Sequence, residues 1–108
     1  MQLISSKSKG SYTESFTAIK TSIRYSFTDK DKKTFVITSA NAGDGKTNIA
    51  INLAISLATD EMKTLLVDCS LMNHKIDKTL KINNSFGISD VLLGRRKLEQ
   101  TIKKYKNN

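Results

Sequence analysis

The residues best suited to chemistry lie in one short run, residues 39–47, which reads SANAGDGKT. Gly45, Lys46 and Thr47 match the end of the phosphate-loop pattern G-x-x-x-x-G-K-S/T, and Ala40 stands where the pattern has its first glycine. Because glycine has no Cβ, the backbone can approach an anion closely, and successive N–H groups can point into one concavity. The run therefore predicts a loop that binds phosphate groups.

Two side chains of this run have predicted roles of their own. The Lys46 ammonium is expected to neutralise β- and γ-phosphate oxygens, and the Thr47 hydroxyl is expected to ligate a Mg²⁺ ion that bridges the same phosphates. The alternative is a glycine-rich turn followed by a chance Lys-Thr pair, and the elements on either side favour the phosphate loop. The predicted nucleotide-binding set is Ala42, Gly43, Asp44, Gly45, Lys46, Thr47 and Asn48.

A second candidate group is the carboxylate of Asp68, which ends the apolar run of residues 64–68. The carboxyl ends of parallel strands form the edge at which such folds bind ligands. We therefore predict that Asp68 reaches Mg²⁺ or the attacking group. Lys46 and Asp68 are then the predicted catalytic residues, and Thr47 and Asp68 the predicted metal ligands. The alternative role for Asp68 is to cap the turn that follows it.

The elements that must position these groups follow from hydrophobic periodicity. Apolar and β-branched residues at 34–39 and 64–68 predict two strands, the second buried on both faces. The apolar stripe within residues 46–59 predicts the helix between them. Strand, loop, helix and strand form a βαβ unit, which implies a parallel pair of strands.

Further helices are predicted on both sides of this unit. The capping-box pattern that runs from Ser11 to Glu14 predicts a helix over about 12–26. The predicted fold class is therefore α/β, with a parallel sheet and flanking helices. The later expected elements are a helical turn near 75–80, a short helix near 89–93 and a basic helix over about 97–105.

Composition limits the class of protein. The 108 residues have room for one small domain, which we place at 11–108 behind a flexible polar tail at 1–10. No apolar run approaches the roughly 20 residues that span a bilayer, and the start has no apolar signal core. The single Cys69 excludes a disulfide within the chain and is expected to be a small buried residue; His74 is expected at the surface. These features predict a cytoplasmic setting.

The formal net charge of +8 falls mostly in the second part of the chain. Residues 70–108 hold nine Lys and Arg side chains against three Asp and Glu side chains. Such a region attracts phosphates, acidic protein surfaces or anionic lipid, or it is a solvated face. Anion binding by this basic region alone is therefore one functional alternative.

In their order along the chain, these motifs resemble the bacterial tyrosine kinase family that regulates capsule and exopolysaccharide synthesis. The resemblance runs from about Glu14 to Ile102. Residues 38–47 are similar to the family's Walker A motif, residues 65–68 resemble its Walker A′ strand, and residues 87–94 (GISDVLLG) closely match a segment further along. The family has a phosphate-loop NTPase fold, so the chain is expected to hold the N-terminal part of that fold.

The resemblance implies ATP and Mg²⁺ as cofactors, and autophosphorylation on tyrosine between the subunits of a ring. It implies activation by the cytoplasmic tail of a membrane polysaccharide co-polymerase, through which a cytoplasmic protein would be associated with the membrane. It also implies a homo-oligomer formed through the first helix, where Glu14 is kept and Thr17 and Lys20 stand in place of arginines. No nucleic acid is expected as a partner.

Departures from the family's pattern shape the functional prediction. Ser70 replaces the second Asp of Walker A′, no apolar Walker B strand follows, and there is no C-terminal tyrosine cluster. We therefore predict a truncated form of an ATP-binding, autophosphorylating tyrosine kinase that regulates capsular or exopolysaccharide biosynthesis. The partial fold, with the Walker B half absent, is not expected to be active alone.

Two other functions stay open. One is a catalytically inactive nucleotide-binding remnant, or an adaptor for the membrane co-polymerase. The other is a partition-type ATPase, a class that usually carries a second Lys early in the loop, where residues 40–42 have none.

Overall fold

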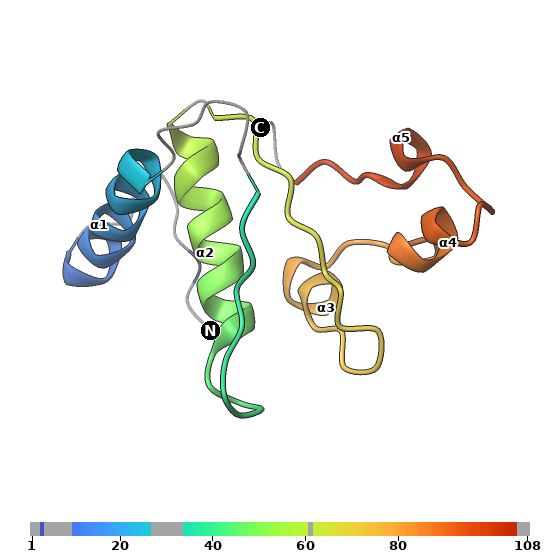
Figure 1. Ribbon diagram of the computed structural model, residues 1–108, viewed down its shortest axis with the longest axis horizontal. Helices are drawn as coiled ribbons and strands as arrows, with labels where there is room; N and C mark the ends of the chain where they lie inside the picture. Colours follow the sequence, from blue (N-terminus) through green and yellow to red (C-terminus); the bar gives the residue numbers. More distant parts are fainter. Residues whose placement is uncertain (1–2, 4–9, 27–33, 61, 106–108) are drawn as a thin grey trace. The chain divides into compact units, whose positions relative to one another are not determined.

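The computed structural model describes residues 3, 10–26, 34–60 and 62–105. The chain divides into two compact units, Met1–Thr64 and Leu65–Asn108, which are described here one at a time. Most of the predicted flexible tail, residues 1–10, lies outside the described residues. The helices in the described part are α1 (Ser11–Ser26), α2 (Lys46–Thr59), α3 (Ile76–Leu80), α4 (Ile88–Leu92) and α5 (Leu98–Thr101) (Figure 1).

Helix α1 confirms the helix predicted over about 12–26. Its first turn is closed by the backbone N–H of Glu14, which donates to the Gly10 carbonyl at 3.1 Å, and the helix begins at Ser11, the residue predicted to cap it. The side chain of Ser11 lies outside the described part, and the capping box is not tested. The hydroxyls of Thr17 and Thr21 donate to carbonyls four residues back, at 3.0 and 2.9 Å, which satisfies them within the helix.

Helix α2 has the bounds that its apolar stripe predicts. Ile51, Leu53 and Leu57 are buried, and so is the polar Asn52 between two of them. The buried surface of α2 is therefore wider than a single apolar stripe. Asn52 is satisfied locally, because its Nδ2 donates to the backbone carbonyl of Asn48 at 3.0 Å and to its Oδ1 at 2.6 Å. The helix therefore buries a polar group at no cost in unmade hydrogen bonds.

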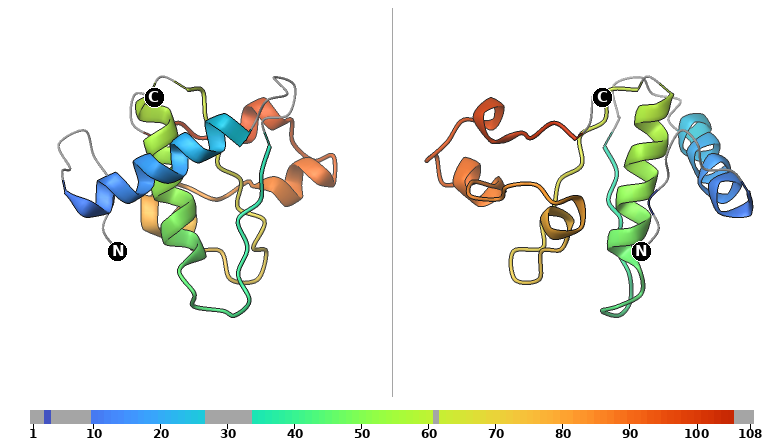
Figure 2. Two further views of the ribbon diagram at one scale, coloured as in Figure 1. Left: turned by 60° about the vertical axis from the view of Figure 1, so that its left-hand side comes forward. Right: turned by 180° about the vertical axis from the view of Figure 1, so that it is seen from behind.

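The core of the first unit is small and joins α1 to α2. Phe16 of α1 packs with Leu53 and Leu57 of α2, and Figure 2 shows α1 crossing α2 in its left view and lying beside it in its right view. Ile23 and Ile37 pack against this cluster from α1 and from the segment before the loop. The same contacts therefore hold α1, α2 and residues 34–39 in one unit.

An ion pair ties the two helices together at the carboxyl end of α2. The Nζ atom of Lys20 lies 2.8 Å from Oδ2 of Asp60, and Nη1 of Arg24 lies 3.4 Å from the same oxygen. The hydrogen bond from Lys20 lowers the pKa of the Asp60 carboxyl below its ordinary value; desolvation opposes this shift, and the charges of Lys20 and Arg24 add to it. Lys20 is only 11% exposed, so its ammonium group is used within the chain.

The predicted parallel sheet is not confirmed. Within the described residues there is no β-strand, and residues 34–39 and 62–70 run without regular secondary structure. Val36 is 85% exposed and Leu65 is 55% exposed, so the prediction that residues 64–68 are buried on both faces is wrong. A strand forms through backbone hydrogen bonds to a neighbour, and a lone strand or strand pair is marginal in water.

The second unit holds three short helices joined by turns. Helices α3 and α4 confirm the turn expected near 75–80 and the helix expected near 89–93, the latter shifted by one residue. Helix α4 starts where the Gly87 N–H donates to Oδ2 of Asp90 at 2.8 Å. Helix α5 has only four residues, so the basic helix predicted over about 97–105 is too long. Such a short helix lacks the packing it would need to propagate through two adjacent lysines.

We predict that Leu53→Ala lowers the free energy of unfolding by about 2–5 kcal/mol, because Leu53 is buried in the small core between α1 and α2. Urea unfolding followed by circular dichroism measures the change. The matched control is Ile49→Ala, on the same helix but 41% exposed, which is expected to lose less than half as much. Equal losses for the two variants would contradict the packing described here.

We predict that Lys20→Met raises the pKa of Asp60 toward the ordinary value of about 3.9. With Lys20 present the pKa is lowered in the folded state, so the ionised carboxylate stabilises the fold above about pH 4. That contribution is lost as the pH falls through the lowered pKa. A carboxyl-carbon NMR titration measures the midpoint, and Arg24→Gln, which removes the more distant partner, is expected to shift it less. An unchanged midpoint in Lys20→Met would rule out the ion pair.

Candidate functional site

The candidate phosphate loop connects residues 34–39 to α2 and has the backbone that its glycines predict. Gly43 has φ 85° and Gly45 has φ 90°, both in the left-handed region that favours glycine. No atom lies within 4 Å of a Cβ built at either position, so the backbone angle rather than crowding requires glycine there. Residues 40–45 are exposed, as a loop that receives a ligand must be.

The loop ends at the amino end of α2, where Lys46 is the first helical residue. The Gly45 carbonyl accepts the N–H of Ile49 at 3.0 Å, and no side chain caps the helix at Gly45. The first turn holds no acidic residue. The first N–H groups of a helix point outward and carry the positive end of its dipole, so this end of α2 favours an anion.

A chain of hydrogen bonds runs across the loop. Nζ of Lys46 donates to Oγ of Ser39 at 3.1 Å, and the Ser39 hydroxyl donates to the Asn41 carbonyl at 2.9 Å. The Asn41 N–H in turn donates to Oδ2 of Asp44 at 3.0 Å. The loop is therefore braced by its own side chains. Ser39 is not among the residues predicted from the sequence, since it precedes the phosphate-loop pattern.

The other predicted residues of the loop differ in how they are placed. Thr47 is half-buried in the first turn of α2, beside Lys46. The Oδ1 atom of Asn48 accepts an amide hydrogen from the Asn52 side chain, so this side-chain oxygen faces along the helix. Ala42 is exposed with the glycines. The structure thus brings together the predicted set at 42–48, and which of its members bind a ligand stays a prediction.

Asp68 belongs to the second unit and has a local partner there. Its Oδ1 accepts the Ser70 N–H at 2.9 Å, which is the turn-capping arrangement that the sequence left as an alternative. The described residues contain no cluster of three or more His, Cys, Asp and Glu that could hold a metal ion. The roles of Thr47 and Asp68 as metal ligands therefore stay predictions.

Two minor predictions near Asp68 have different outcomes. Cys69 is exposed, so the expectation of a buried residue is wrong, because the surrounding segment does not become a buried strand. His74 is partly exposed, and its Nδ1 lies 2.9 Å from Oδ1 of Asp77. The hydrogen bond from His74 lowers the pKa of the Asp77 carboxyl, against the opposing effect of desolvation.

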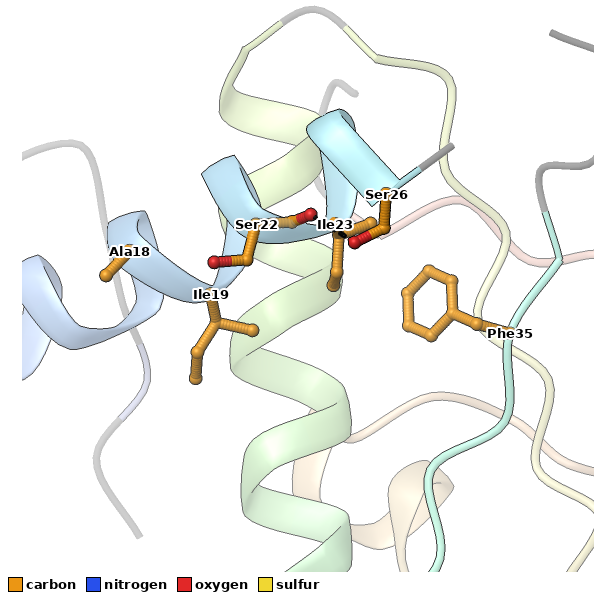
Figure 3. A pocket seen from close by; sticks show the side chains of 6 residues that line it. All are labelled: Ala18, Ile19, Ser22, Ile23, Ser26 and Phe35. Atoms are coloured by element: carbon orange, nitrogen blue, oxygen red, sulfur yellow. Dashed lines mark hydrogen bonds between the residues drawn. The ribbon is translucent and has the colours of Figure 1, made fainter. Parts of the chain in front are cut away.

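A groove of about 390 Å³ lies in the first unit beside α1. Figure 3 shows its lining: Ala18, Ile19, Ser22, Ile23 and Ser26 from α1, with Phe35 facing them. The lining is apolar apart from two hydroxyls and carries no charge, so the groove lacks the groups that bind phosphate. The groove is therefore not a candidate phosphate site. None of the described helices has both the length and the apolar composition needed to cross a bilayer.

Comparison with known proteins identifies a nucleotide-binding domain family and several bacterial tyrosine-protein kinases as similar to this chain. The family model of the CobQ/CobB/MinD/ParA nucleotide binding domain matches residues 35–108. Tyrosine-protein kinase YwqD of Bacillus subtilis is 33% identical over 90 residues, 83% of this chain and 38% of that protein. Tyrosine-protein kinase CpsD of Streptococcus agalactiae is 37% identical over 90 residues, 82% of this chain and 38% of that protein. Tyrosine-protein kinase etk of Escherichia coli K12 is 26% identical over 95 residues, 88% of this chain and 13% of that protein.

These matches confirm the resemblance to bacterial tyrosine kinases that the motifs predict, and the family match supports the α/β class without confirming the sheet. The chain spans well under half the length of these relatives. No solved structure matches the chain significantly. Because the family model covers the loop, α2 and the whole second unit, the chain belongs to the CobQ/CobB/MinD/ParA nucleotide-binding domain family.

Proposed function

We propose that the chain binds ATP with Mg²⁺ through residues 42–48, with the triphosphate at the amino end of α2. The observation that carries the proposal is the placement of Lys46 at that helix end, directly after two left-handed glycines in an exposed loop. Backbone N–H groups, the helix dipole and the ammonium group all favour the same anion. Membership of a nucleotide-binding family supports this assignment.

Each group of the site has a separate task in this proposal. The Lys46 ammonium has three donors and suits β- and γ-phosphate oxygens. The Thr47 hydroxyl suits Mg²⁺, which prefers oxygen ligands and usually bridges phosphates. When bound, the ion would neutralise phosphate charge that the loop alone leaves uncompensated. Asp68 is the proposed second protein ligand, a role in which its carboxylate would exchange the Ser70 N–H for the metal ion.

We propose further that the chain is part of an autophosphorylating tyrosine kinase in capsular or exopolysaccharide biosynthesis. The relatives in several bacteria are tyrosine-protein kinases, which supports the reaction. The proposed activator is the cytoplasmic tail of a membrane polysaccharide co-polymerase, which would hold a cytoplasmic protein near the membrane. In a homo-oligomer formed through α1, Glu14 is exposed for contact, whereas Lys20 is already paired with Asp60.

A second candidate function is a nucleotide-binding adaptor without catalysis. It is favoured by Asp68, whose oxygen is engaged in a turn, and by Ser70, which offers no second carboxylate. The family also takes its name from MinD and ParA, so a partition-type ATPase is the remaining alternative. Incubation of the purified chain with ATP and Mg²⁺, followed by mass spectrometry, separates them. Phosphotyrosine supports the kinase, free phosphate alone supports the ATPase, and binding without either product supports the adaptor.

We predict that Lys46→Met weakens MgATP binding by about 10- to 100-fold, because a hydrogen bond to a charged group contributes about 1.5–3 kcal/mol. Isothermal titration calorimetry of the whole chain measures the dissociation constant. Lys63→Met is the matched control, since Lys63 is an exposed lysine of the same unit outside the loop. An unchanged dissociation constant in Lys46→Met would reject the proposed site, and an equal loss in both variants would point to nonspecific charge effects.

A further inference from the structure

We infer that Ser39 is a positioning residue for Lys46, holding the ammonium group over the loop where the β- and γ-phosphates are proposed to bind. The inference rests on the proposed nucleotide binding and assigns a role to a residue outside the phosphate-loop pattern. Its basis is the pair of hydrogen bonds that join Lys46 to Ser39 and Ser39 to Asn41.

The chemistry of the three groups fixes the direction of these hydrogen bonds. An ammonium group only donates, a backbone carbonyl only accepts, and a hydroxyl has one hydrogen and two lone pairs. The Ser39 hydrogen must therefore point to the Asn41 carbonyl, 2.9 Å away, and a lone pair of Oγ must face the Lys46 ammonium, 3.1 Å away. The Ser39 side chain is consequently held as an acceptor for Lys46.

This contact leaves the charge of Lys46 available to a ligand. Among the residues that the structure describes, Lys46 forms no ion pair, although the carboxylate of Asp44 stands in the same loop. Oδ2 of Asp44 instead accepts the Asn41 N–H. A neutral hydroxyl uses one of the three ammonium donors and leaves two for phosphate oxygens. A carboxylate in its place would compete with the phosphate for the same charge.

If the ammonium group is already held in place, less side-chain conformational entropy is lost when a nucleotide binds. A lysine side chain has four flexible carbons and loses considerable rotamer freedom when its end is fixed. In this structure, Lys46 and Ser39 are both half-buried, and the chain itself supplies the contact that holds the ammonium group. Preorganisation of this kind raises affinity without adding a contact to the ligand. Ser39 is thus expected to act through Lys46 rather than on the nucleotide directly.

The test compares MgATP affinity in three variants of the whole chain by calorimetry. Ser39→Ala is expected to weaken binding about tenfold, which corresponds to about 1.4 kcal/mol. Ser39→Thr keeps the hydroxyl and is expected to retain most of the affinity. Thr59→Ala removes an exposed hydroxyl at the other end of α2 and is expected to leave affinity unchanged. Unchanged affinity in Ser39→Ala would overturn the inference and leave the proposed nucleotide site standing.

A double-mutant cycle separates positioning from a general structural role. If Ser39 acts through Lys46, adding Ser39→Ala to Lys46→Met should cause no further loss, so the two losses are not additive. Chemical-shift titration measures the weaker binding expected of these variants. Additive losses would mean that Ser39 supports the loop independently of Lys46, which contradicts the inference.

One readout needs no nucleotide and keeps the two proposals distinguishable. The carbon-relaxation order parameter of the Lys46 Cε group is expected to exceed that of exposed Lys63, and to fall toward it in Ser39→Ala. An order parameter no higher than that of Lys63 in the unaltered chain would overturn the inference by itself. If the unaltered chain binds no MgATP although Lys46 is ordered, the proposed function fails and the lysine contact remains.

Discussion

The burial of α2 against α1 is the contact on which the geometry of the loop depends. A helix of 14 residues is marginal in water by itself, so α2 owes its stability to Leu53 and Leu57, which pack on Phe16. Lys46 is both the last residue of the loop pattern and the first residue of this helix. If the core were lost, the first turn of α2 would no longer be held in place. The N–H groups of that turn, which favour an anion, would then lose their fixed orientation.

The charged side chains at the two ends of α2 have different kinds of partner. At its carboxyl end, Asp60 forms ion pairs with Lys20 and Arg24 of α1, and these pairs hold the two helices together. At its amino end, Lys46 has a neutral partner in Ser39. Of these three cations, Lys46 has a neutral partner, whereas Lys20 and Arg24 of α1 are paired with a carboxylate.

The helices could be predicted from sequence because their pattern is local. In α1 and α2 the apolar residues recur every three or four positions, and the glycine before Lys46 marks the helix start. The strands could not, because a β-branched run reports only that a segment suits a pleated surface. Whether residues 34–39 form a strand depends on a neighbour distant in sequence, and the described part of the first unit offers none.

In the candidate site, too, the residues of a local pattern could be predicted from the sequence, whereas the role of Asp68 could not. Gly45, Lys46 and Thr47 follow a pattern in which each residue type has one use, and the left-handed backbone at Gly45 is what that pattern requires. Asp68 was open to two roles because a carboxylate accepts equally well from a backbone N–H and from a metal ion, and in this structure the Ser70 N–H is its partner.

Ser39 escaped prediction because a serine before a loop has many possible partners, and only the folded loop brings its oxygen to Lys46. The loop therefore satisfies part of its own polarity through hydrogen bonds among its own residues. Its shape follows from Ser39, Asp44 and the glycines, whereas its charge comes from Lys46 and the helix end. In the proposed function, a phosphate exchanges water for the Lys46 ammonium and the N–H groups of the helix end, which costs less reorganisation than assembling the loop around the ligand.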